Sequence, residues 1–163
     1  YTIQVVLKLL DMYEREFHDL GFSMSLKSML SVMFLLVSCL GGMRGYEVVW
    51  TDLAALRYDV EFCEEADDYT AVAWPVVGRF KSHDGRAGCY MIPIAGTTNS
   101  GITFFVWTQR FIRRLGMNGV VDGWAFRRAD GSRALAADFR EDPVPTTSPA
   151  KQIGCPLDFS CSI

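Results

Sequence analysis

The sequence WPVVGRFKSHDGRAGCYMIPI, residues 74–94, contains two runs rich in β-branched residues on either side of a polar turn. The runs cover 74–80 and 88–94, and an Asp-Gly dipeptide between them favours a tight hairpin connection. We therefore expect two antiparallel strands here. The polar side chains around their turn include Lys81, His83 and Arg86.

Helical spacing of apolar residues flanks this hairpin on both sides. It predicts helices over residues 3–20, 26–40, 102–115 and 135–139. Residues 53–60 are a short apolar stretch that we interpret as a turn entering a strand, and 61–68 as an acidic loop. A short extended piece is expected over 123–126. The predicted fold class is α+β, mainly helical with a small antiparallel sheet or hairpin.

The chain has 163 residues, half of them apolar, which is enough for one domain with a substantial core. We expect that domain over residues 1–140. Four prolines and a weak apolar pattern predict a disordered tail over 141–163. Because the chain starts at Tyr1 and its first residues already have helical spacing, we expect a fragment rather than a targeting peptide.

The net charge of −3 conceals an asymmetry along the chain. Residues 1–74 hold 5 basic against 12 acidic residues, whereas residues 75–140 hold 10 basic against 4 acidic residues. Attraction to phosphate depends on which face carries the charge, so an acidic protein can still present a basic groove. The acidic net charge therefore does not exclude a basic groove built by residues 75–140.

Several classes of protein are disfavoured by the composition. The five cysteines are scattered, odd in number and without a Cys-x-x-Cys pair, which argues against a disulfide framework or a zinc site. The longest apolar run, 29–40, is shorter than the roughly 20 residues of a membrane-spanning helix. We expect an intracellular protein, nuclear if eukaryotic, with no metal, no cofactor and no membrane partner.

Three segments carry a resemblance to a known family. They are GGMRGYEVVWTDLAAL at 41–56, GRFKSHDGRAGCYMIPI at 78–94 and GWAFRRADGSRALAADF at 123–139. Together with the order of the predicted elements, they resemble the catalytic domain of tyrosine recombinases (phage integrases) over roughly residues 25–140. The longer stretch GRFKSHDGRAGCYMIPIAGTTNSGI, residues 78–102, resembles the divergent recombinase-like domains of eukaryotic mobile elements more than bacterial integrases. The resemblance implies an incomplete form of that domain and a role in DNA recombination or integration.

On this resemblance, Arg44 matches the arginine that binds the scissile phosphate, and Lys81 matches the hairpin lysine that protonates the departing 5′ oxygen. A guanidinium offers two parallel donors to phosphate oxygens, and an ammonium can act as a general acid. Glu47 and Asp52 are the supporting residues, Glu47 by orienting Arg44 or holding the start of its segment. The alternatives are that Arg44 only caps the preceding helix and that Lys81 is an ordinary polar hairpin residue.

Five further basic residues are candidates for DNA contacts. Two lie on the hairpin and three on the helix predicted over 102–115, where an ordinary solvated face is the competing interpretation. These five are His83, Arg86, Arg110, Arg113 and Arg114.

The remaining groups of the family active site have no match in this sequence. The only histidines are His18 and His83, so there is no His-x-x-Arg box, and no tyrosine follows Tyr90. Nucleophilic catalysis requires a nucleophile, so this chain alone could hold a phosphate but not cleave it. We expect a DNA-binding remnant of a mobile-element recombinase whose partner is double-stranded DNA, on which it could also self-associate. The alternative is a noncatalytic helical protein-interaction module whose acidic first half contacts a basic partner.

Overall fold

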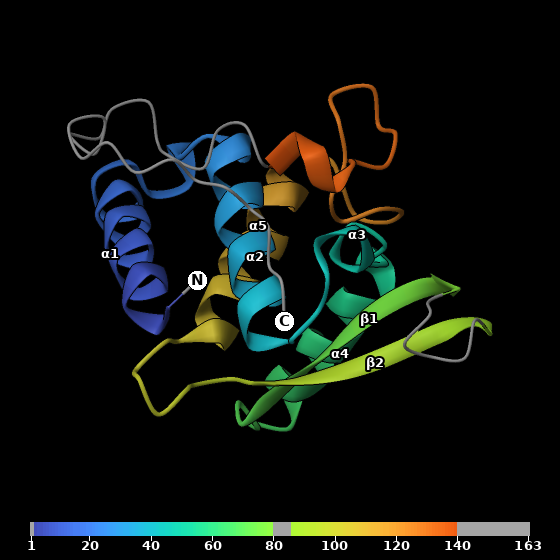
Figure 1. Ribbon diagram of the computed structural model, residues 1–163, viewed down its shortest axis with the longest axis horizontal. Coiled ribbons are helices and arrows are strands. Elements are labelled where there is room, and N and C mark those ends of the chain that lie inside the picture. The colour runs from blue at the N-terminus through green and yellow to red at the C-terminus, as the bar shows by residue number, and fades with distance from the viewer. Residues whose placement is uncertain (1, 80–85, 140–163) are drawn as a thin grey trace.

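The computed structural model describes residues 2–79 and 86–139, which form an α+β fold (Figure 1). The predicted α+β class with a small antiparallel sheet is confirmed. Lys81, His83 and the tail predicted over 141–163 lie outside the described residues. In chain order the elements are α1 (Ile3–Leu20), the 3-10 turn η1 (Gly21–Ser23), α2 (Leu26–Leu40), α3 (Gly45–Val48), α4 (Leu53–Glu65), β1 (Ala71–Arg79), β2 (Ala87–Ala95), α5 (Phe104–Met117) and the 3-10 turn η3 (Ala136–Phe139).

The helix α2 forms the centre of the molecule. Residues 32–37 are all buried, so this helix is covered on most of its sides, with α1 and α5 packed against it (Figure 1). It begins after Ser25, whose side-chain oxygen accepts a 3.0 Å hydrogen bond from the backbone N–H of Ser28. The helix α1 buries one face only, which is the amphipathic pattern expected for 3–20. Both predicted helices are confirmed.

The prediction of a strand over 53–60 is wrong, because these residues begin the helix α4. Asp52 caps it, with Oδ1 accepting a 2.8 Å hydrogen bond from the backbone N–H of Ala55. Leu53, Leu56 and Val60 are buried and share one face at helical spacing. The helix continues to Glu65 and includes most of the segment that we expected to be an acidic loop.

The hairpin is confirmed, and both strands are longer than predicted. β1 and β2 pair antiparallel, with Trp74 opposite Ile92 and Gly78 opposite Gly88. The residues of β1 are largely buried under α4, whereas Ile94 is the only buried residue of β2. The hairpin therefore projects from the helical core with β2 on its outer side.

The segment after α5 closes the core. Phe126 and Phe139 pack on Phe34 of α2, with ring centroids 6.1 and 4.5 Å away respectively. The extended piece expected over 123–126 pairs through an isolated bridge between Asp52 and Trp124, and the short helix expected over 135–139 is η3. One hydrophobic cluster joins residues from α1 to η3.

Neither a membrane-spanning helix nor a cluster of metal ligands is found within residues 2–79 and 86–139. No helix in these ranges is long and apolar enough to cross a membrane. Within the same ranges, no three His, Cys, Asp or Glu side chains gather where they could hold a metal ion.

Cys63 forms no disulfide in the described residues. Burial together with nearby carboxylates raises the pKa of its thiol, so the thiol stays protonated at neutral pH.

Candidate functional site around helix α3

Arg44 stands exposed immediately before α3. Its Nη1 donates a 3.3 Å hydrogen bond to the hydroxyl of Tyr46, and this contact raises the pKa of Arg44 above its ordinary value. The end of α2 is closed by Gly41, whose backbone N–H donates to the Val37 carbonyl at 2.9 Å. Among the described contacts, the guanidinium of Arg44 therefore does not cap the preceding helix.

Glu47 is buried and holds the start of α3. Its Oε2 accepts a 2.9 Å hydrogen bond from the backbone N–H of Arg44, three residues earlier. This is the glutamate half of a capping box, which fixes the backbone from which Arg44 projects. This hydrogen bond corresponds to one of the two supporting roles expected for Glu47, that of holding the start of the segment.

Thr51, which the sequence did not identify as a site residue, joins the segment after α3 to the hairpin. Its hydroxyl donates to the Val48 carbonyl and accepts from Nε1 of Trp74, both at 2.7 Å, and the residue is fully buried. The backbone continues the link, since the N–H of Val77 donates to the Trp50 carbonyl at 3.0 Å. The end of α3 is thus fixed against β1 at positions 76 and 77, shortly before the strand ends at Arg79.

Asp52, the second supporting residue, lies on this link. Its side chain caps α4, and its backbone N–H donates to the Pro75 carbonyl at 3.3 Å. Both contacts position secondary structure around the end of α3. Asp52 therefore supports the site through the backbone.

Arg86 is exposed at the base of β2, where the described part of the hairpin resumes. Its carbonyl accepts a 2.5 Å hydrogen bond from the hydroxyl of Tyr90. Tyr90 is half-buried and packs against the hydrophobic core. The backbone of Arg86 is thereby fixed at the start of β2. The other two hairpin candidates, Lys81 and His83, lie outside the described residues.

The three arginines of α5 lie against α1 and the turn that follows it. Arg110 pairs with Glu14 at 2.9 Å and stacks over the ring of Phe17 at 4.2 Å. Arg113 stacks over Phe22 at 4.6 Å. Arg114 donates from Nε to the carbonyl of Met24 at 3.1 Å. In Figure 1, α1 and α3 lie on either side of α2, so these arginines and Arg44 are not brought together.

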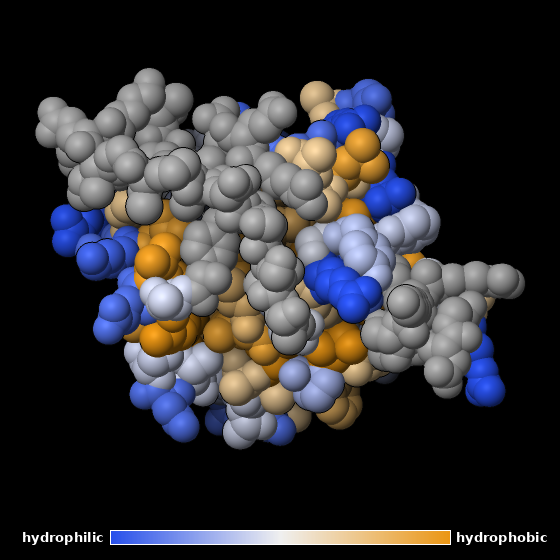
Figure 2. Space-filling model, in the orientation of Figure 1, coloured by the Kyte–Doolittle hydropathy of each residue, from blue (hydrophilic) through white to orange (hydrophobic). Residues whose placement is uncertain are grey.

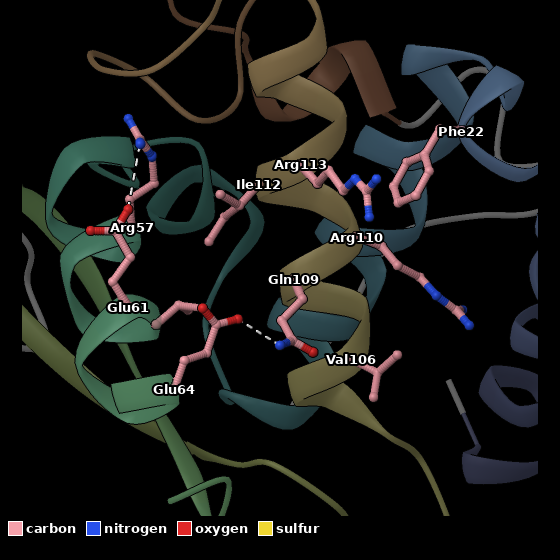
Figure 3. Close-up of a pocket in the computed structure, with 10 residues that line it drawn as sticks. Phe22, Arg57, Glu61, Glu64, Val106, Gln109, Arg110, Ile112 and Arg113 are labelled. Carbon is pink, nitrogen blue, oxygen red and sulfur yellow. Dashed lines mark hydrogen bonds and ion pairs between the residues drawn. The ribbon is translucent and has the colours of Figure 1, made fainter. Parts of the chain in front are cut away.

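A pocket of about 420 Å³ opens between α4 and α5, on a different part of the surface (Figure 3). Glu64 of α4 points toward Gln109 of α5 and accepts its 2.6 Å hydrogen bond, while Glu61 pairs with Arg57 at 3.4 Å. The polar side chains that line the pocket are thus paired with one another. Glu64 and Gln109 are bonded between α4 and α5, and Arg57 and Glu61 are paired within α4.

The site around α3 is defined by position and charge. It has one exposed guanidinium on a capped turn, a buried threonine link to the hairpin, and a hairpin base carrying Arg86. The helical spacing of Leu53, Leu56 and Val60 after Asp52 is the signal that could have revealed α4, and with it the turn that holds Thr51.

Comparison with protein-family models, curated proteins and solved structures finds no match for this chain.

Proposed function

We propose that this chain binds double-stranded DNA through Arg44 and the Lys81 hairpin, as the corresponding part of a tyrosine recombinase-like domain acting in recombination or integration. One observation carries the proposal. The Trp50 carbonyl accepts from the N–H of Val77, and Thr51 bridges Val76, so the segment after Arg44 is fixed to the strand that leads into Lys81. Arg44 is thereby carried on a segment that contacts β1, the strand that precedes Lys81 in the sequence.

The chemistry of Arg44 supports a phosphate contact. Its guanidinium is exposed, remains protonated and can present two N–H donors to one phosphate. Glu47 restrains the backbone beneath it, which lowers the entropy lost on binding. The proposed activity is binding without cleavage, because these 163 residues include neither a His-x-x-Arg box nor a tyrosine after Tyr90.

An electrophoretic shift with mixed-sequence duplex at about 50 and about 200 mM salt tests this function. Arg44→Ala and Lys81→Ala should each weaken binding several-fold, most clearly at low salt. Arg15→Ala is the matched control, since Arg15 pairs with Asp11 on the exposed side of α1. Equal binding by the wild type and both site variants would remove the proposal.

A protein-interaction module is the second candidate, and the surface of α4 favours it. Tyr58 and Phe62 are 73 and 60 % exposed one turn apart, with Glu61 and Glu65 exposed beside them. Exposed aromatic residues flanked by carboxylates suit a basic, partly apolar partner helix. Combined Tyr58→Ser and Phe62→Ser changes should then abolish binding of a lysine-rich amphipathic peptide while DNA binding stays unchanged. Peptide binding that survives both changes would exclude this surface.

A further inference from the structure

A second group of arginines lies beside α3, in the loop of residues 122–134, here named the arginine loop. Arg133 places its guanidinium carbon 3.9 Å from the ring centroid of Trp50. Trp50 in turn meets Trp124 edge to face, with ring centroids 5.4 Å apart. The two tryptophans and the guanidinium of Arg133 thus pack together where the arginine loop meets the turn after α3.

Arg127 is held in the same loop by neutral acceptors. Its Nε donates to the Trp124 carbonyl at 2.9 Å and its Nη2 to the Asp122 carbonyl at 2.5 Å. Carbonyl groups fix the direction of a guanidinium without cancelling its charge. Arg133 is likewise bonded to a carbonyl, that of Ala134 at 3.4 Å, in addition to its contact with Trp50.

Arg128, between them, is different. It forms two hydrogen bonds with the Asp138 carboxylate, at 2.8 and 3.0 Å, and this pairing lowers the pKa of Asp138. A bidentate ion pair neutralises the arginine locally. Among the described contacts, Arg127 and Arg133 are half-buried and bonded to neutral carbonyl groups, so their charges are not paired with a carboxylate there. Arg128 is exposed, and its charge is paired with Asp138.

The arginine loop is fixed to the turn that carries Arg44. The N–H of Ala125 donates to the Thr51 carbonyl at 3.0 Å, and the N–H of Leu53 donates to the Gly123 carbonyl at 2.9 Å. A Cβ placed on Gly45 would lie 3.5 Å from the Cβ of Ala136, so the residue after Arg44 abuts the chain that leaves the loop. Figure 1 shows the loop above α3, and Figure 2 shows hydrophilic residues there, interspersed with hydrophobic ones.

We propose that Arg127 and Arg133 of the arginine loop extend the DNA-binding surface of Arg44, contacting backbone phosphates next to the one that Arg44 holds. The inference rests on the proposed function. Stacking on Trp50 engages the face of the Arg133 guanidinium and leaves edge N–H groups to meet phosphate. Trp50 is then a positioning residue, and the bridge between positions 127 and 133 keeps the two cations on one loop.

The aromatic residues favour duplex over single-stranded nucleic acid. Single strands are bound by aromatic faces left open for bases. Here the face of Trp50 is covered by Arg133, and Trp124 packs against Trp50, with both tryptophans half-buried. The surface therefore presents charge to a phosphate backbone.

The test is a salt-dependent binding titration of the full chain with a mixed-sequence duplex and with a single strand of the same sequence. Arg127→Gln and Arg133→Gln should each weaken duplex binding several-fold and reduce the slope of log affinity against log salt by about 0.9. Trp50→Leu should match the loss of Arg133→Gln, because the guanidinium loses its support. Arg15→Ala is again the control, and the thermal midpoint of each variant is measured alongside.

The conservative changes separate charge from folding. Arg127→Lys should keep the salt slope of the wild type even if it lowers the thermal midpoint, because the positive charge is retained. If the wild type binds no duplex, the proposed function fails and this inference with it. If Arg44→Ala weakens binding but Arg127→Gln and Arg133→Gln bind like the wild type, this inference alone is overturned. Tighter binding to the single strand than to the duplex would also overturn it.

Discussion

Trp74 donates its indole N–H to the hydroxyl of Thr51 at 2.7 Å, and both side chains are fully buried. This bond joins the turn after α3 to the middle of β1. β1 continues from Trp74 to Arg79. The contact therefore fixes the direction of this strand relative to the turn after α3. The bond therefore supports the proposed DNA surface without touching DNA.

Thr51→Val should destabilise the fold by about 1–3 kcal/mol, because a buried indole N–H loses its acceptor. Thr51→Ser keeps the hydroxyl and is the matched control, with a smaller loss expected. Chemical denaturation of the three proteins measures the difference. Equal free energies of unfolding for Thr51→Val and Thr51→Ser would show that the hydrogen bond contributes nothing.

Glu47→Ala should cost about 0.5–2 kcal/mol, since the backbone N–H of Arg44 loses its capping partner. Glu47→Gln retains a side-chain oxygen and should lose less. DNA affinity should fall with Glu47→Ala even though Glu47 is buried, because the segment that carries Arg44 becomes less ordered. A protein that unfolds like the wild type would contradict the capping role.

Arg110→Ala should destabilise the packing of α1 on α5 by about 1 kcal/mol, through loss of stacking on Phe17 and of the pair with Glu14. Arg110→Met keeps much of the packing and separates it from the charge. The same variants test the DNA contact predicted for Arg110. An unchanged salt slope would indicate that Arg110 has a structural role only. A slope reduced by about 1 would indicate that Arg110 contacts a DNA phosphate.

Acid should weaken the contact between the arginine loop and η3. The Arg128 guanidinium holds the pKa of Asp138 below its ordinary value, so the pair adds stability above the unfolded pKa of aspartate, about 3.9. That contribution is lost as the pH falls from about 3.9 through the lower folded pKa. Unfolding free energies of the wild type and Arg128→Ala should therefore differ at neutral pH and converge in acid. A difference that stays constant with pH would contradict the pairing.

The sequence predicted the elements whose determinants are local. The Asp-Gly turn between two β-branched runs identified the hairpin, and apolar spacing identified α1, α2 and α5 within a few residues. Residues 53–60 were misassigned because a short apolar run fits a strand or a helix equally well. Asp52 as a cap, with the spacing of Leu53, Leu56 and Val60, is what decides for the helix.

The geometry of the site was less accessible to sequence. The bond between Thr51 and Trp74 joins positions 23 residues apart, and Arg133 reaches Trp50 from near the other end of the described chain. Such contacts depend on how α3, β1 and the arginine loop pack, which no local pattern encodes. The prediction of Arg44 as a phosphate ligand came from resemblance, and its exposed position is compatible with it.

A double-mutant cycle on duplex affinity tests most directly whether Arg44 and Lys81 act at one phosphate. The wild type, Arg44→Ala, Lys81→Ala and the double variant are titrated with the same duplex at one low salt concentration. Two cations at a shared phosphodiester should show a coupling energy of about 0.5 kcal/mol or more, so the double variant loses less than the two single losses combined. Strictly additive losses, or no loss from either change, would contradict the account.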